Sequence, residues 1–230
     1  MIYFKPAGLV FPEPLQRPLM IEINDNIPFL WRLRAQGDSE GFCIVSMVVP
    51  FNTGDSKLEH TIETDIISLA ADYDGTNEDE ILEWNEDDIS LFLKLITNTS
   101  AGRSLAPGGS IKVDLNDPDT IEIVNIVAAA GFGLAQTGDN YLMNSDHSQM
   151  SFQCDVGTQI SLNTVTGYKR GVVVDMDEDH VVCVMLESIE RVSSTQEDEI
   201  LPHDVILVKR HQVLDPLYTR TEPVQSDVVH

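Results

Sequence analysis

Acidic side chains between residues 72 and 88 are the densest set of groups in this sequence that could do chemistry. Carboxylates at this density could hold a cation, or could present a negative surface to a basic partner. Charge runs are also common on solvated helix faces, where they only keep a protein soluble. The sequence leaves these readings open for nine residues: Asp72, Asp74, Glu78, Asp79, Glu80, Glu83, Glu86, Asp87 and Asp88.

The spacing of these carboxylates fits a calcium loop poorly. Counted from Asp72, oxygen-bearing side chains fall at positions 1, 3, 5, 7, 9 and 12, but Asn77 lies at position 6, where the loop needs glycine. A second acidic stretch, residues 175–179, is typical of a hairpin tip. His180 and Cys183 are three residues apart, which places them on opposite faces of a strand and argues against a shared zinc ion. We therefore expect no metal and no other cofactor.

The motifs of nucleotide binding and nucleophilic catalysis are incomplete. Residues 102–108 lack the spacing and the lysine of a phosphate-binding loop, and no GxSxG is present. The segment from Leu105 to Val113, followed by a helix and by Gly131-Phe132, resembles the late part of class I methyltransferases over about thirty residues. The glycine-rich turn that would bind the methyl donor in that family has no counterpart upstream. We expect no enzymatic activity, with a degenerate or active methyltransferase-like enzyme as an alternative.

The charge balance excludes whole classes of partner. The chain has 230 residues, with 14 Lys and Arg against 38 Asp and Glu, for a net charge of −24. Such a surface repels phosphate backbones and anionic lipids, so we expect no direct nucleic-acid or membrane partner. Within residues 51–100 the imbalance is 13 acidic against 2 basic residues.

The cysteines and the first residues indicate the compartment. Cys43, Cys154 and Cys183 are widely separated and odd in number, which indicates reduced thiols that act as small buried hydrophobes. The first residues do not resemble a signal peptide. The longest apolar stretch, residues 121–135, is too short and too polar to span a bilayer. We expect a soluble protein that is cytoplasmic, or part of a virion if the source is viral.

Prolines dominate the first twenty residues and recur near the end. Four prolines before residue 20 exclude a helix and a central strand, and so predict an extended, apolar arm over residues 1–20. Residues 213–230 read as an extended tail. An arm of this kind must pack on something, and its candidate partner-binding residues are Phe4, Leu9, Val10, Phe11 and Leu15.

Between arm and tail, hydrophobic periodicity predicts two domains. Residues 77–97 predict either two abutting short helices, with Asn77 and Asn85 as N-caps, or one helix with an acidic face. A second, buried helix should run from Asp117 to a glycine stop at Gly131. Strands are expected at residues 21–23, 29–33, 42–49 (closed by Pro50), 61–69, 111–115, 159–162, 171–174, 181–186 and 205–208.

These elements predict an α+β domain over residues 21–150, followed by a small all-β barrel of SH3-like size over residues 151–212. The arm, the tail and the incomplete motifs favour a non-catalytic structural component of a large protein assembly. A phage capsid, neck or tail is a plausible setting, with homo- or hetero-oligomeric protein partners. The alternative is an acidic binding protein or DNA mimic that neutralises a basic, nucleic-acid-binding protein.

Overall fold

The computed structural model describes nine segments of the chain. The predicted arm residues Phe4, Leu9, Val10, Phe11 and Leu15 lie outside these segments, as does the predicted tail beyond residue 217. The arm and the tail therefore stay predictions. The described residues are 19–23, 29–35, 42–53, 56–69, 79–99, 104–105, 111–143, 154–190 and 199–217.

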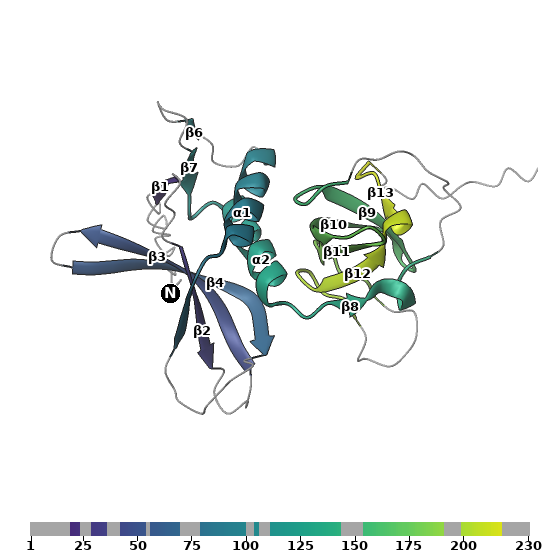
Figure 1. Cartoon of the computed structure of the whole chain (residues 1–230), viewed down its shortest axis with the longest axis horizontal. Coiled ribbons are helices and arrows are strands. Elements are labelled where there is room, and N and C mark those ends of the chain that lie inside the picture. The colour runs from purple at the N-terminus through teal and green to yellow at the C-terminus, as the bar shows by residue number, and fades with distance from the viewer. Residues whose placement is uncertain are drawn as a thin grey trace, which may run out of the picture.

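An antiparallel four-stranded sheet begins the described fold (Figure 1). Its strands lie in the order β4-β3-β2-β5. Buried and exposed residues alternate along β4, because successive side chains point to opposite faces and only one face is covered. The three strands predicted here are confirmed as β2, β3 and β4 and prove longer, whereas β5 was not predicted as a strand. The bounds are β2 Leu30–Ala35, β3 Phe42–Thr53, β4 Ser56–Leu69 and β5 Glu80–Glu83.

The predicted helix over residues 77–97 is wrong in its first half. Glu80 to Glu83 form strand β5, which pairs antiparallel with β2 and sets Leu82 opposite Trp31. A helix start is favoured by only a few tenths of a kcal/mol per residue, and pairing with a sheet edge overrides such weak local preferences. The near-repeat of the two acidic octets therefore does not produce two helices.

The second half of that prediction is confirmed. Helix α1 spans Glu86–Asn98 and is capped by Asn85. The Asn85 side chain accepts from the Asp88 N–H at 2.9 Å, and the Asp88 carboxylate accepts from the Asn85 N–H at 3.0 Å. This reciprocal capping box fixes where the helix begins. The apolar side that α1 buries consists of Leu91, Phe92, Leu95 and Ile96.

Helix α2 (Pro118–Phe132) is the central element of the molecule. Asp117 is its N-cap and Gly133 its C-cap, close to the predicted ends. The four-stranded sheet packs on one side of α2 and the C-terminal sheet on another (Figure 1). This double coverage confirms the prediction of a helix buried on nearly all faces, because almost every residue from Ile123 to Ala129 is out of contact with water.

The predicted C-terminal barrel is wrong, because these strands form an open sheet. Its order is β13-β9-β10-β11-β12-β8, and the two outermost strands do not pair with each other in the described chain. Closing a barrel requires that pairing. β8 joins β12 in parallel, from chain that precedes the boundary placed at residue 150. The bounds are β8 Gln136–Thr137, β9 Gln159–Thr164, β10 Gly167–Met176, β11 His180–Met185, β12 Val205–Lys209 and β13 Val213–Leu214.

A third, small sheet completes the fold, with the order β1-β7-β6. The described chain is therefore mostly β, roughly an α+β fold, with two α-helices and three sheets in place of the predicted α+β domain followed by a closed barrel. Two short 3₁₀ helices connect strands of the C-terminal sheet: Gly138–Asn140 follows β8, and Arg210–Gln212 lies between β12 and β13. The strands of the small sheet are β1 Met20–Ile23, β6 Ser104–Leu105 and β7 Ile111–Asp114.

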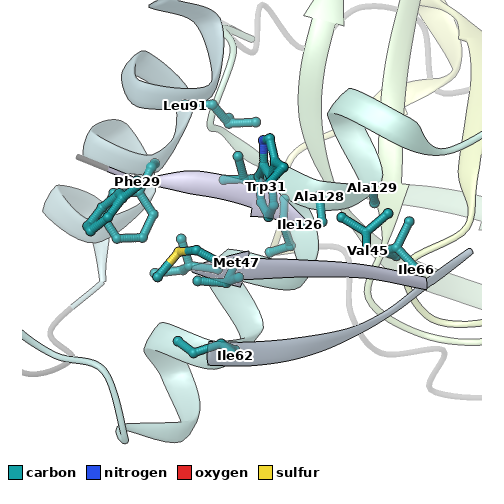
Figure 2. Packing of buried hydrophobic residues seen from close by; sticks show 14 of the residues in the cluster. Phe29, Trp31, Val45, Met47, Ile62, Ile66, Leu91, Ile126, Ala128 and Ala129 are labelled. Atoms are coloured by element: carbon teal, nitrogen blue, oxygen red, sulfur yellow. The ribbon is translucent and has the colours of Figure 1, made fainter. Parts of the chain in front are cut away.

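Two apolar cores hold these layers together. The larger core lies between the four-stranded sheet and the helices, and it extends to Val172, Val184 and Val205 of the C-terminal sheet. Figure 2 shows Trp31 and Met47 among its packed side chains. The opposite face of the C-terminal sheet forms the second core. All three cysteines are free and buried, as predicted.

An ion pair ties α2 to the turn before β12. Glu122 Oε2 lies 3.1 Å from Nε2 of His203. His203 has a positive φ of 70°, a conformation that non-glycine residues rarely adopt. The hydrogen bond and charge of His203 lower the pKa of Glu122 below its ordinary value of 4.5, although partial burial acts in the opposite direction.

The pH dependence of this pair gives a first prediction. A carboxylate with a lowered pKa in the folded state stabilises the fold above its unfolded pKa, and that stabilisation is lost as the pH falls through the lower value. We expect Glu122→Gln to lower the melting temperature slightly near about pH 5.5, and the deficit to vanish as the pH falls below about 4.5. Thermal scans across pH test this, with the exposed Glu199→Gln as control. A deficit that grows in acid would contradict it.

Candidate functional site

The structure divides the acidic stretch instead of presenting it as one face. Asp72, Asp74 and Glu78 lie outside the described residues. Asp79 accepts two hydrogen bonds of 3.2 Å from the Arg34 guanidinium. This pairing raises the pKa of Arg34 above its ordinary value. Asp79 is therefore paired with an arginine of the four-stranded sheet.

Asp88 is withdrawn into the fold altogether. It is only 7% exposed, and besides the Asn85 N–H its Oδ2 accepts from the indole Nε1 of Trp31 at 3.2 Å. Burial raises the pKa of Asp88, and the hydrogen bonds from Asn85 and Trp31 partly oppose that rise. The remaining described members of the stretch are exposed, on β5 and in the first turn of α1: Glu80, Glu83, Glu86 and Asp87.

The outer face of the four-stranded sheet, which points away from the helices, mixes apolar and charged groups. Ile67, Ile81 and Phe42 are 51%, 47% and 43% exposed. The strand register places Ile67 beside Ile44, then Arg34, while Ile81 lies beside Arg32. Arg32 in turn bonds Glu59 at 2.7 Å. We call this set of side chains, from Phe42, Ile44, Ile67, Ile81, Arg32, Arg34, Glu59 and Asp79, the outer face.

Beyond the sheet, β3 and β4 continue as a two-stranded ribbon. The pairing of β2 with β3 ends at Leu30 and Val48, whereas β3 and β4 stay paired as far as Thr53 and Ser56. Residues 49–53 and 56–60, the β3–β4 ribbon, extend away from the body (Figure 1). The expectation that Pro50 closes the strand is wrong. Pro50 is tolerated here because no described strand pairs with β3 on the side where its N–H is missing.

A cavity of about 390 Å³ lies where α1 and the end of α2 approach β10. Its volume is within the range of small-ligand sites. Charged, polar and apolar groups share its walls. The lining residues are Asn85, Asp87, Asp88, Ser90, Leu91, Lys94, Ala130, Gly131, Val156, Val174 and Asp175.

Neither the known protein families nor the curated proteins contain a match to this sequence.

The partial resemblance to class I methyltransferases is not supported by the topology. Its strand, β7, has antiparallel neighbours on both sides, β1 and β6. Nucleotide-binding folds of the doubly wound type carry mostly parallel sheets, with the ligand at the carboxyl ends of the strands. The helix that follows β7 is α2. Because most of α2 is buried against the two sheets, only its last turn lines the cavity.

The metal hypotheses gain no geometric support. Asp72, Asp74 and Glu78 of the calcium count lie outside the described residues, and the count continues into β5. The stretch 175–179 spans the end of β10 and the tip of the β10–β11 hairpin, where Asp177 accepts from the Asp179 and His180 N–H groups. Within the described segments, no three His, Cys, Asp or Glu side chains are grouped so as to hold a metal ion.

Sequence reasoning missed both the outer face and the cavity. The outer face depends on strand register, which only the paired partners reveal. The cavity joins α1 with residues 156, 174 and 175, far apart in sequence and without a motif.

Across the described residues, no helix combines the length and the apolar composition that crossing a bilayer requires.

Proposed function

We propose that this chain is a non-catalytic component of a larger protein assembly and binds its neighbours through the β3–β4 ribbon and the outer face. The ribbon is the observation that carries this proposal. A two-stranded hairpin is marginally stable in water by itself, and gains stability when another surface covers it. Contact with a neighbouring protein of the assembly would explain why the β3–β4 ribbon extends beyond a well-packed sheet.

The chemistry of the outer face supports the same role. Exposed Ile67, Phe42 and Ile81 supply apolar contact, and Arg34 is 57% exposed beside them. Arginine and aromatic side chains, here Arg34 and Phe42, are enriched at the centres of protein interfaces. The setting we propose is a phage or virus particle, on the strength of the proline-rich apolar sequence of residues 1–18.

Shortening the ribbon tests the proposal. Removing residues 50–53 together with 56–59 deletes four facing pairs and keeps the register of the strands that remain. We expect the shortened chain to fold with its melting temperature nearly unchanged and to lose its stoichiometric partners. The measurement is affinity purification of the tagged chain from its native source, washed at low and high salt, with partners identified by mass.

Two point variants serve as a matched pair. Ile67→Ser lies on the outer face and should weaken partner binding at least about tenfold, equal to about 1.4 kcal/mol. Leu207→Ser, 38% exposed on the C-terminal sheet, should leave binding intact. Full retention of partners by both the shortened chain and Ile67→Ser would overturn the proposal. Basic partners released as salt rises would instead support the acidic-binder alternative.

A further inference from the structure

The outer face combines exposed apolar side chains with neighbouring charges. Ile67 on β4 and Ile81 on β5 are 51% and 47% exposed, and Phe42 adds a ring that is 43% exposed. The strand register places both isoleucines in rows that pass through an arginine of β2. Large apolar groups gathered on one exposed sheet face are typical of a surface that another protein segment covers.

The charges of this surface favour a slightly basic ligand. Asp79, Glu63 and Glu59 all act on the guanidinium of Arg34, so the three carboxylates lie around it. Arg32, the second arginine of the face, bonds Glu59 at 2.7 Å. These two cations and three anions leave one negative charge in excess. A segment that covers the outer face should therefore be apolar and carry a small positive charge.

The first 18 residues of this chain have that composition. Residues 1–18, which lie outside the described residues, contain two basic residues, Lys5 and Arg17, and one acidic residue, Glu13. The rest of the chain keeps 12 of the 14 basic and 37 of the 38 acidic residues, so the positive surplus of residues 1–18 contrasts with a strongly negative remainder. The large hydrophobic residues of the segment are Met1, Ile2, Tyr3, Phe4, Leu9, Val10, Phe11 and Leu15.

The described chain begins on the side of the sheet opposite the outer face. Leu19 and Ile21 pack against the larger core, and the Leu19 N–H donates to the Asp114 carboxylate at 3.1 Å. A segment of 18 residues reaches at most about 60 Å. The paired part of β2 and β3, from Leu30 to Ala35 on β2, is only about 20 Å long. Residues 1–18 are therefore long enough to leave the helix side of one copy and cross the outer face of a neighbour.

We propose that residues 1–18 of one copy of this chain bind the outer face of a second copy. The apolar run at residues 9–11 covers Ile67 and Ile81, and the basic residues of the segment meet the excess carboxylate. This inference rests on the proposed function, since it names the neighbour that the outer face binds. Each copy donates one segment and accepts one, so the contact is head-to-tail and builds rings or filaments.

Mixing two variants of the full-length chain tests this contact. Phe4→Ser/Phe11→Ser damages the segment, and Ile67→Ser damages the outer face. In sedimentation velocity the parent chain should associate beyond its 25.6 kDa monomer, and each variant alone should associate at least about tenfold more weakly. An equal mixture of the two variants should form a dimer of twice the monomer mass, because the Ile67→Ser chain donates its intact segment to the intact face of the other.

Matched controls separate this contact from general effects of substitution. Gln16→Ser changes a polar residue of the same segment, and Leu207→Ser changes an exposed apolar residue of the C-terminal sheet. Both controls should associate as the parent does. Circular dichroism should show the same melting temperature for Ile67→Ser as for the parent, since Ile67 is exposed.

The inference is refuted by a parent chain that stays monomeric, by association that survives both damaging variants, or by a mixture that remains monomeric. These failures are distinct from a failure of the proposed function. If the parent is monomeric but Ile67→Ser loses its partners in the purification from the native source, the outer face binds a different protein. That result refutes the inference and supports the proposed function.

Discussion

Trp31→Ala is expected to lower the free energy of unfolding by about 4 kcal/mol, the range found for large aromatic side chains cut back to alanine in a core. Trp31 is 1% exposed, stacks on Trp84 with ring centroids 4.8 Å apart, and meets Phe132 edge-on at 5.6 Å. The change removes these contacts and leaves a cavity between β2, α1 and α2. Urea denaturation followed by circular dichroism measures the loss. A loss below about 1 kcal/mol would contradict this account of the core.

A comparison of two phenylalanine substitutions isolates the hydrogen bond from the packing. Trp31 donates its indole N–H to Asp88, whereas no described residue accepts from the equally buried indole N–H of Trp84. Trp31→Phe should therefore be more destabilising than Trp84→Phe, by about 1–2 kcal/mol, because it also leaves a buried carboxylate with one donor fewer. Equal losses in both variants would show that Asp88 gains nothing from the indole.

The elements that the sequence predicts correctly are those with strong local signals. Asn85 and Asp117 are N-caps followed by acidic or proline-led first turns, and both helices begin where these signals place them. The nearly continuous apolar run of β3 and the alternation of β4 likewise identify strands. Such signals act within a few residues, so they are present in the sequence itself.

What failed depends on partners far away in the chain. The four residues of β5 carry helix-start signals, yet the edge of β2 recruits them as a strand. β8 consists of Gln136 and Thr137, two exposed residues with no strand pattern, and it occupies the edge of the C-terminal sheet. Local spacing can predict four or five short strands, but it cannot predict whether the first and last strands of the sheet pair with each other. The predicted barrel failed for this reason.

The candidate sites show the same limit. The acidic stretch is conspicuous in sequence, but the structure buries Asp88, pairs Asp79 with Arg34 and leaves the other described members on two different elements. The cavity instead recruits Asp175 from the distant hairpin beside Asp88. The acidic run in the sequence therefore identified the wall of the cavity formed by α1, but it did not indicate that β10 forms the opposite wall.

Gly133→Ala is expected to destabilise the protein by about 3 kcal/mol, at the upper end of the cost of overpacking. Gly133 ends α2, and its N–H donates to the Ala129 carbonyl at 2.8 Å. A Cβ at Gly133 would lie 2.5 Å from that same carbonyl oxygen and 2.5 Å from Val205 Cγ2. Backbone cannot yield as a flexible side chain can, so the end of the helix must move away from β12. Urea denaturation measures the effect.

Gly131→Ala is the matched control, two residues earlier on the same helix. Its Cβ would meet only Asp88 Oδ1, at an ordinary contact distance of 3.5 Å. Because alanine is favoured over glycine within a helix by about 0.8 kcal/mol, this variant should be neutral or slightly more stable than the parent. Similar stabilities for the two variants would mean that the junction of α2 with β12 is loosely packed. A large difference between them would show that the end of α2 is tightly packed against β12, beside the larger core that α2 shares with both sheets.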